Sequence, residues 1–332
     1  IFPEPEEVIC SGQHPGDATT ASRHIEDAST TTAGLISSAA NSAFRSAFNS
    51  LLGSVERQDL DTGLAAGDHS LDLSAWAAFS HVDTDNTHKP TRFNSKSNTV
   101  LVGVDTSINE NLIIGLALGV EETSIDTVFN LGEQELNGYT VAPYIGYLLT
   151  PNFSIDASFG YTTVDIDQFR ISVAPIAVPG VNTGDTESDR VFVSGNLNYF
   201  NTFDRWFFAG RLGVIYAEED IDAVVEVGPD AFTSAARTVE FGQVQVAAEL
   251  AYTGLEFEPY LLAVYENDFE HEDVLLNSAQ VAPANDDDSF RLGLGMRYFW
   301  SDQASINFTF DWQIDRDDYE SKALSVNGRW AF

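Results

Sequence analysis

The sequence ends with the stretch LSVNGRWAF, residues 324–332, in which apolar and polar positions alternate. In an extended strand, one face would carry Leu324, Val326, Gly328, Trp330 and Phe332. The opposite face would carry small and polar residues, among them Arg329. An apolar face that ends in aromatic side chains, backed by a polar face with an arginine, is typical of a strand between lipid and a water-filled lumen. The stretch therefore predicts a transmembrane β-strand.

The same two-residue alternation recurs upstream and predicts twelve strands. They cover residues 70–82, 97–108, 111–123, 136–149, 152–166, 187–200, 205–218, 238–252, 255–268, 288–300, 303–315 and 321–332. Many of the apolar faces begin or end in an aromatic residue, for example Tyr139 and Tyr147, or Phe290 and Trp300. Rings at both ends of an apolar band form the girdles of outer-membrane barrels. We therefore expect an all-β fold, a 12-stranded antiparallel transmembrane outer-membrane β-barrel spanning residues 70–332.

The connections between these strands alternate between short and long. The short ones are predicted at 109–111, 150–152, 201–205, 253–255 and 301–303, and the long ones near 83–96, 122–135, 166–187, 218–238 and 267–288. Short periplasmic turns and long extracellular loops are the asymmetry expected of such a barrel. With an even number of strands, both ends of the barrel chain would lie on the periplasmic side.

The composition excludes some classes of protein. No apolar run approaches the roughly 18–20 residues that a membrane helix needs. The 16 basic residues are outnumbered by 51 acidic ones, for a net charge of −35, which argues against nucleic acid as a partner. The single cysteine, Cys10, has no second cysteine to pair with. We interpret Cys10 as a spare residue, with lipidation or an intermolecular thiol as the alternatives.

Residues 32–57 show a helical rather than a strand pattern. Apolar side chains recur at spacings of three and four residues, and Arg45 is among the polar residues between them; the apolar set includes Ile36, Ala40, Phe44, Phe48 and Leu51. The helix would be roughly 35–40 Å long at ~1.5 Å per residue. It is too polar to face lipid, so we expect it in the pore; docking on another surface is the alternative. We divide the chain into a flexible passenger remnant or linker (1–31), the pore helix with its linker (32–60) and the barrel.

Several short motifs, in this order, resemble the translocator (β) domain of autotransporters, the type V secretion family. After the helix come VGVD at 102–105, NLIIGLALG at 111–119, EPY at 258–260, YENDF at 265–269 and GRWAF at 328–332. The resemblance implies an outer-membrane protein that exports an N-terminal passenger and anchors it at the cell surface, with the pore plugged by the helix. It also implies that the barrel-assembly machinery reads a terminal signal, to which we assign Val326, Gly328, Trp330 and Phe332.

The expected partners are outer-membrane lipid, the barrel-assembly machinery and the passenger, around a monomeric barrel. Only about thirty irregular residues precede the predicted helix, so we expect the passenger to be absent or very short here. Some family members cut the passenger at an asparagine within the helix. Asn41 and Asn49 are the asparagines of the predicted helix, and residues upstream of both are present, so we do not expect that cleavage.

The sequence offers no constellation that predicts catalysis, a metal or a cofactor. Gly-x-Ser-x-Gly, His-Glu-x-x-His, P-loop and paired-cysteine motifs are missing. His271 lies in the run Glu270–Asp273, and an aspartate triplet covers Asp286–Asp288. We interpret both as solvated loop residues, because the triplet lacks the glycine and terminal glutamate of a calcium loop.

Charged residues on the polar faces of the predicted strands are the candidate site. We predict a lumenal position for Asp105, Asp156, Arg190, Arg211, Glu249, Glu258, Arg291, Arg297, Asp311 and Arg329. These side chains either grip the helix and tune ion passage, or pair with one another because unpaired buried charges are costly. Lumenal glycines such as Gly115, Gly160 and Gly295 would leave room for the helix.

Two other functions fit the sequence besides the translocator. One is a porin-like channel with a periplasmic N-terminus. The other is a surface adhesin or structural barrel that binds partners through its acidic outer loops.

Overall fold

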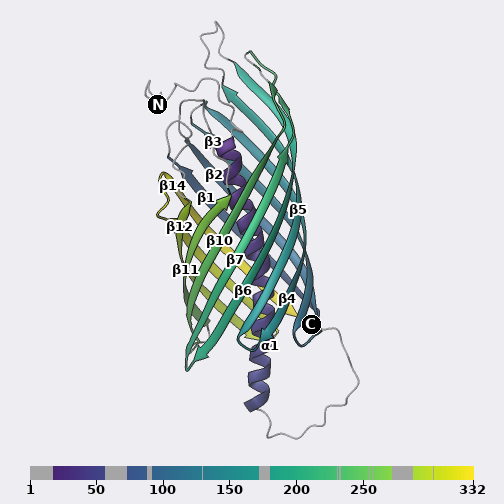
Figure 1. The fold of residues 1–332 in the computed structure, drawn as a ribbon, viewed down its shortest axis with the longest axis vertical. Helices are drawn as coiled ribbons and strands as arrows, with labels where there is room; N and C mark the ends of the chain where they lie inside the picture. The colour runs from purple at the N-terminus through teal and green to yellow at the C-terminus, as the bar shows by residue number, and fades with distance from the viewer. Residues whose placement is uncertain are drawn as a thin grey trace.

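The structure is a computed structural model that describes residues 18–56 and 73–332, except for 88–91, 129, 172–179, 230, 232, 254, 256, 271–286 and 302. One helix, α1 (Ala18–Glu56), precedes the strands; its side chains are described from His24 to Phe44. Twelve strands form a closed antiparallel barrel around the helix (Figure 1), which confirms the predicted fold class. The barrel strands are β1 (Leu73–Asn86), β2 (Phe93–Asn109), β3 (Leu112–Thr127), β4 (Gly132–Thr150), β5 (Phe153–Ile171), β6 (Val181–Phe203), β7 (Trp206–Ile221), β10 (Arg237–Tyr252), β11 (Phe257–Glu270), β12 (Asp288–Ser301), β13 (Ala304–Ile314) and β14 (Tyr319–Ala331).

The barrel closes by pairing its first strand with its last. β1 pairs with β14 over the register Ser74–Ala331 to Asn86–Tyr319. The amide of Phe332 donates a further hydrogen bond of 2.9 Å to the carbonyl of Leu73. A closed barrel leaves no strand edge unpaired, which is a condition for a sheet that is surrounded by lipid.

Apolar side chains face outward and polar ones face the lumen, the reverse of a water-soluble protein. In β3, Leu116 and Leu118 are 43% and 53% exposed, whereas Ala117 between them is fully buried. The aromatic residues that end the apolar faces, including Tyr139, Tyr161, Trp206 and Trp300, are also exposed on the outer surface. The lumenal face carries buried serine, threonine, asparagine and charged residues. Among the described residues, no helix is long and apolar enough to cross a membrane.

The strands extend further than predicted at one end of the barrel. We call this the loop end; the other end, with connections at 110–111, 151–152, 204–205, 253–256 and 302–303, is the turn end. The predicted long loop at 122–135 is reduced to residues 128–131, because β3 and β4 continue pairing beyond their apolar segments. The connection between β7 and β10 also contains a small sheet of β8 (Val224–Val225) and β9 (Thr233–Ser234). Mostly polar alternation, as in Glu133–Asn137, forms these strand extensions, so a search for apolar faces underestimated them.

The helix starts at the loop end, runs through the lumen and ends at the turn end (Figure 1). It has 39 residues, about 58 Å at the standard rise of ~1.5 Å. The prediction that residues 1–31 lack regular structure is therefore wrong from Ala18 onward. The first turns lack an apolar stripe because they contact polar lumenal side chains. The apolar periodicity therefore begins well after the first residue of the helix, and the predicted start at residue 32 was too late. Residues 1–17, which include Cys10, lie outside the described part of the chain.

Lumenal glycines make room for the helix indirectly, by letting aromatic rings of neighbouring strands lie flat along the wall. A Cβ at Gly115 would overlap the ring of Tyr144, and one at Gly160 would overlap Phe192. Gly146 is the position that faces the helix, because a Cβ there would approach the ring of Phe44. Thus the glycines predicted to accommodate the helix mostly accommodate wall residues.

We expect the substitution Gly115→Ala to destabilise the barrel by about 1–3 kcal/mol, the usual cost of overpacking. The Tyr144 ring cannot move aside freely, because its hydroxyl donates to Asp105 and accepts from Trp76. Gly195→Ala is the matched control, since its Cβ would meet only the carbonyl of Asp156 at 4.0 Å. The measurement is the midpoint of thermal unfolding in detergent, followed by the heat-induced shift in electrophoretic mobility. Equal midpoints for the two variants would contradict this account.

Candidate functional site

At the loop end, the helix is joined to the wall by a buried cluster around Arg190 on β6. The Arg190 guanidinium donates to Glu219 on β7 at 2.6 Å and to Glu121 on β3 at 3.0 Å. Its third nitrogen lies 2.9 Å from Nε2 of His24 on α1. All four side chains are at most 5% exposed. One arginine therefore ties two strands and the helix together away from solvent.

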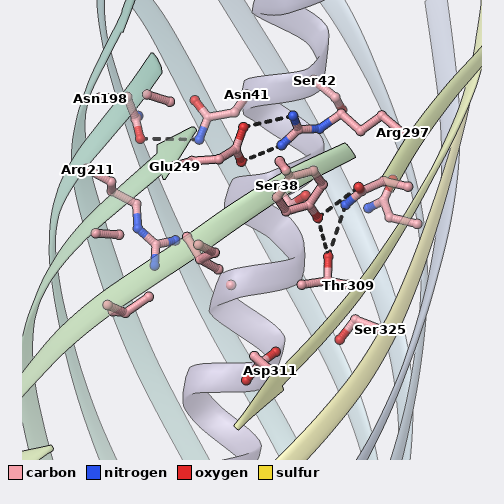
Figure 2. Close-up of a pocket in the computed structure, with 18 of the residues that line it drawn as sticks. Ser38, Asn41, Ser42, Asn198, Arg211, Glu249, Arg297, Thr309, Asp311 and Ser325 are labelled. Atoms are coloured by element: carbon pink, nitrogen blue, oxygen red, sulfur yellow. Dashed lines mark hydrogen bonds and ion pairs between the residues drawn. The ribbon is translucent and has the colours of Figure 1, made fainter. Parts of the chain in front are cut away.

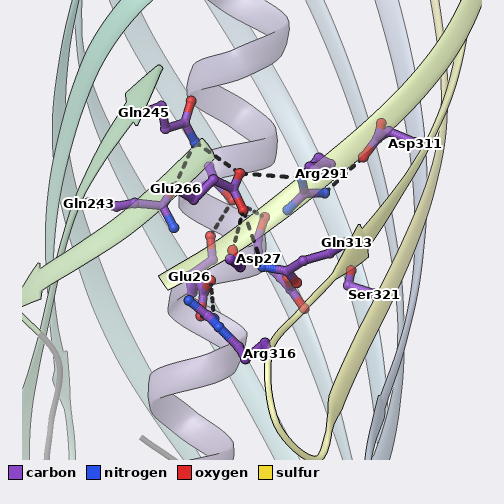
Figure 3. Close-up of polar contacts among 12 residues, drawn as sticks. Glu26, Asp27, Gln243, Gln245, Glu266, Arg291, Asp311, Gln313, Arg316 and Ser321 are labelled. Carbon is purple, nitrogen blue, oxygen red and sulfur yellow. Dashed lines mark hydrogen bonds and ion pairs between the residues drawn. The ribbon is translucent and has the colours of Figure 1, made fainter. Parts of the chain in front are cut away.

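A second buried cluster joins the helix to the opposite side of the lumen. Arg316, in the turn between β13 and β14, donates to Glu26 on α1 at 2.8 Å and to Asp268 on β11 at 2.6 Å. Next to it, Asp27 accepts hydrogen bonds from Thr84 on β1 and Tyr319 on β14, at 2.9 and 3.1 Å. Arg316, Glu26, Asp27 and their neighbours are drawn in Figure 3, which shows the loop end downward. Two consecutive helix residues thus contact different parts of the wall, Glu26 the turn between β13 and β14 and Asp27 the strands β1 and β14.

The middle of the helix packs on the wall with small apolar and amide side chains. Ile36, Ala39 and Ala40 are at most 1% exposed and share one apolar cluster with wall residues that include Ala117. Polar contacts continue on the next face of the helix. Ser37 accepts a hydrogen bond of 3.2 Å from Asn196, and Asn41 donates one of 3.3 Å to Asn198. The two wall residues, Asn196 and Asn198, also donate to Asp156.

Near the turn end, the pair Arg329 and Asp105 connects the closing strand to the helix. Arg329 donates two hydrogen bonds to the carboxylate of Asp105 and a third, of 3.2 Å, to the backbone carbonyl of Ala39 on α1. Phe44 of the helix packs nearby with Ile113. The helix is therefore held to the wall at several points between His24 and Phe44.

A cavity of about 670 Å³ remains between the helix and β11, β12 and β13, and residues of β6, β7, β10 and β14 also line it. Its wall carries the ion pair of Arg297 on β12 with Glu249 on β10, and Arg297 lies over the Tyr260 ring at 4.2 Å (Figure 2, again with the loop end downward). Arg211 also lines the cavity and donates to Gln245 at 3.0 Å. The helix contributes Ser38, Asn41 and Ser42. The lumen is thus filled on one side and open on the other.

The structure places the predicted lumenal charges inside the barrel and pairs several of them with each other. The pairs are Arg329 with Asp105, Arg297 with Glu249, and Arg291 with Asp311 at 2.9 Å. Arg190, Asp156 and Arg329 also contact the helix or residues bound to it. Pairing with one another and contact with the helix therefore both occur, at different positions.

Several residues of these clusters were missed by the sequence reasoning. They are His24, Glu26 and Asp27 on the helix, Glu121, Glu219, Glu266 and Asp268 on strands, and Arg316 in a turn. The strand residues were detectable, because each continues the polar face of its strand by alternation. The helix residues were hidden by the absence of an apolar stripe, and Arg316 by its position in an acidic turn.

The other predicted positions divide into described and undescribed ones. Ile36, Ala40 and Phe44 are buried against the wall. Arg45, Phe48 and Leu51 lie in α1, but their side chains are outside the described part, as are Asn49 and His271. Trp330 and Phe332 point outward, 48% and 71% exposed, with Val326 and Gly328 on the same face. Within the described residues, no group of three or more histidine, cysteine or acidic side chains is placed to hold a metal ion.

We expect Arg190→Met to destabilise the folded barrel by about 3–5 kcal/mol, because it leaves two buried carboxylates without their cation. Lys322→Met is the control: its pair with Glu320 has side chains 47% and 43% exposed, and such surface pairs contribute about 0–1 kcal/mol. Thermal unfolding in detergent measures both. If the two variants unfold at the same temperature, the Arg190 cluster does not hold the helix to the wall.

Comparison with known proteins agrees with this architecture. The family model for the autotransporter beta-domain matches residues 28–311. Outer membrane protein B of Rickettsia rickettsii is 27% identical over 169 residues, and its counterpart in Rickettsia conorii is similar to the same extent. These matches cover 47% of this chain and only 9% of each relative.

Solved structures share the fold at low sequence identity. The translocator domain of the autotransporter NalP from Neisseria meningitidis superposes with a TM-score of 0.64 and 13% identity, covering 91% of this chain and 99% of that one. The beta domain of the Bordetella autotransporter BrkA gives a TM-score of 0.62 and 12% identity, covering 79% and 100%. This chain belongs to the autotransporter beta-domain family and is a bacterial outer-membrane β-barrel.

Proposed function

We propose that this chain exports an N-terminal passenger through the outer membrane, anchors it at the cell surface and is then closed by its own helix. One observation carries the proposal: α1 enters the lumen at the loop end and leaves it at the turn end (Figure 1). Any polypeptide N-terminal to α1 is therefore connected to the loop end. With the longer connections outside and the short turns in the periplasm, that end faces the exterior.

The packing of the helix supports its role as a plug. An α-helix with its side chains has a diameter of about 10–12 Å, and α1 lies against β1–β7, β10 and β14. A buried ion pair at Glu26, a buried hydrogen bond between Arg190 and His24, and a backbone contact at Ala39 hold it in place. In this proposal the passenger moves outward during assembly, and the helix remains in the lumen afterwards.

The last strand is our proposed recognition signal for the barrel-assembly machinery. Trp330 lies on the outer face and meets Trp300 edge to face, with ring centroids 6.4 Å apart. Val326, Gly328 and Phe332 share its face, so the signal would be readable from the membrane side. We also propose a monomer in outer-membrane lipid, since the closed barrel has no free strand edge for a second subunit.

An epitope tag at residue 5 tests the proposed orientation. Protease added to intact cells should remove this tag, because the segment before the helix is outside. A tag inserted between Pro151 and Asn152, in a turn at the other end, is the matched control and should be lost only after the outer membrane is permeabilised. Protection of the first tag on intact cells, with loss after permeabilisation, would put the N-terminus in the periplasm and favour the channel.

A further inference from the structure

The space beside the helix extends along only part of the lumen. The cavity begins among turn-end residues, Thr253 and Leu255, and reaches Glu266 and Arg291 towards the loop end. Its lining mixes apolar residues, such as Leu262 and Phe299, with charged and hydroxyl side chains. On the hydroxyl-bearing part, Ser38 and Ser42 of the helix face positions such as Thr309 and Ser325 (Figure 2). The charged residues of the lining, among them Arg297, Glu258 and Asp311, suit water, ions and small polar solutes. The structure thus contains a half-channel along β11–β13.

Beyond Glu266, the lumen is closed by side chains rather than by the helix backbone. Arg316 bridges the gap between helix and wall: one guanidinium nitrogen binds Glu26 of α1 and another binds Asp268 of β11. These three side chains are at most 3% exposed. Gln313 and Ser289 fill the adjacent space, both hydrogen-bonded to Glu266 at 3.2 and 3.0 Å (Figure 3).

The turn that carries Arg316 is shaped to send this side chain inward. Asp315 and Asp318 on either side have positive φ angles of 64° and 58°, a conformation that aspartate tolerates better than most residues. The Arg316 guanidinium also lies 5.6 Å from the centre of the Tyr319 ring. A tight hairpin turn at the rim therefore places its arginine in the lumen.

We propose that Glu26, Arg316 and Asp268 form an electrostatic gate that closes a half-channel for ions and small hydrophilic solutes. This inference rests on the proposed function, since it assumes that α1 stays in the lumen. It adds that the helix alone does not seal the pore, because its body leaves the space along β11–β13 open. Removal of the gate opens a path through the barrel while the helix remains bound through His24 and Ala39.

The current through the full chain in planar lipid bilayers tests the gate. The wild-type barrel should be closed. Arg316→Ala should raise the current on the order of tenfold or more, and so should the near-isosteric Glu26→Gln as a second variant. A tenfold rise corresponds to a loss of about 1.4 kcal/mol in the free energy of closing. Arg170→Ala is the matched control. It also breaks a buried ion pair at the loop end, with Glu226 at 2.7 Å, but Arg170 does not line the cavity.

A thiol in the cavity tests whether the current takes the proposed path. Ser325→Cys, in a background with Cys10→Ser, places a reactive group in the half-channel with little change in side-chain size. A charged thiol reagent should then reduce the current of the gate variants, and should have no effect when Ser325 is retained.

Three results would overturn the gate. The first is no current in either gate variant. The second is a current in Arg170→Ala equal to that of the gate variants. The third is a gate-variant current that the charged reagent does not reduce when Ser325→Cys is present. Each is separate from the orientation test, because the tag at residue 5 reports which side the N-terminus faces whether or not the barrel conducts. An exposed tag together with a silent Arg316→Ala would leave the translocator proposal standing and remove the gate alone.

Discussion

The structure depends on pairing charges inside a barrel whose outer surface is apolar. A buried charge without a partner is costly, and some of the wall cations bond to the helix as well as to the wall. Arg316 has one carboxylate on the wall, Asp268, and takes a second from Glu26 on the helix. Arg329 completes its bonds with the carbonyl of Ala39. The helix is therefore part of the electrostatic structure of the lumen, in addition to occupying space there.

The barrel was predictable from the sequence because two-residue alternation with aromatic ends is a direct consequence of lipid on one side. Several strands run further than predicted towards the loop end, and mostly polar segments such as Glu133–Asn137 show little apolar signal there. The lumenal position of Arg329 and Arg297 followed from the same alternation. Their partners did not, since pairing between β2 and β14 or between β10 and β12 depends on how side chains reach across the lumen.

The helix shows the opposite limit of sequence reasoning. Ile36, Ala40 and Phe44 marked it through their apolar spacing, and they are buried as expected. His24, Glu26 and Asp27 form no apolar pattern, because they contact polar side chains that lie far away in the sequence. The helix also sits off-centre, against β1–β7, β10 and β14. That asymmetry, which leaves the cavity along β11–β13, has no counterpart in the periodicity of α1.

The most direct test of the account is the position of the helix in the assembled protein. Ser37 on α1 accepts a hydrogen bond of 3.2 Å from Asn196 on β6. With Ser37→Cys and Asn196→Cys in a Cys10→Ser background, oxidation or a short thiol crosslinker should join the two residues in cells and shift the mobility of the denatured protein. The pair Ser37→Cys and Thr309→Cys, across the cavity, should not react. Crosslinking of the second pair, or of neither in a folded barrel, would contradict a helix fixed on one side of the lumen.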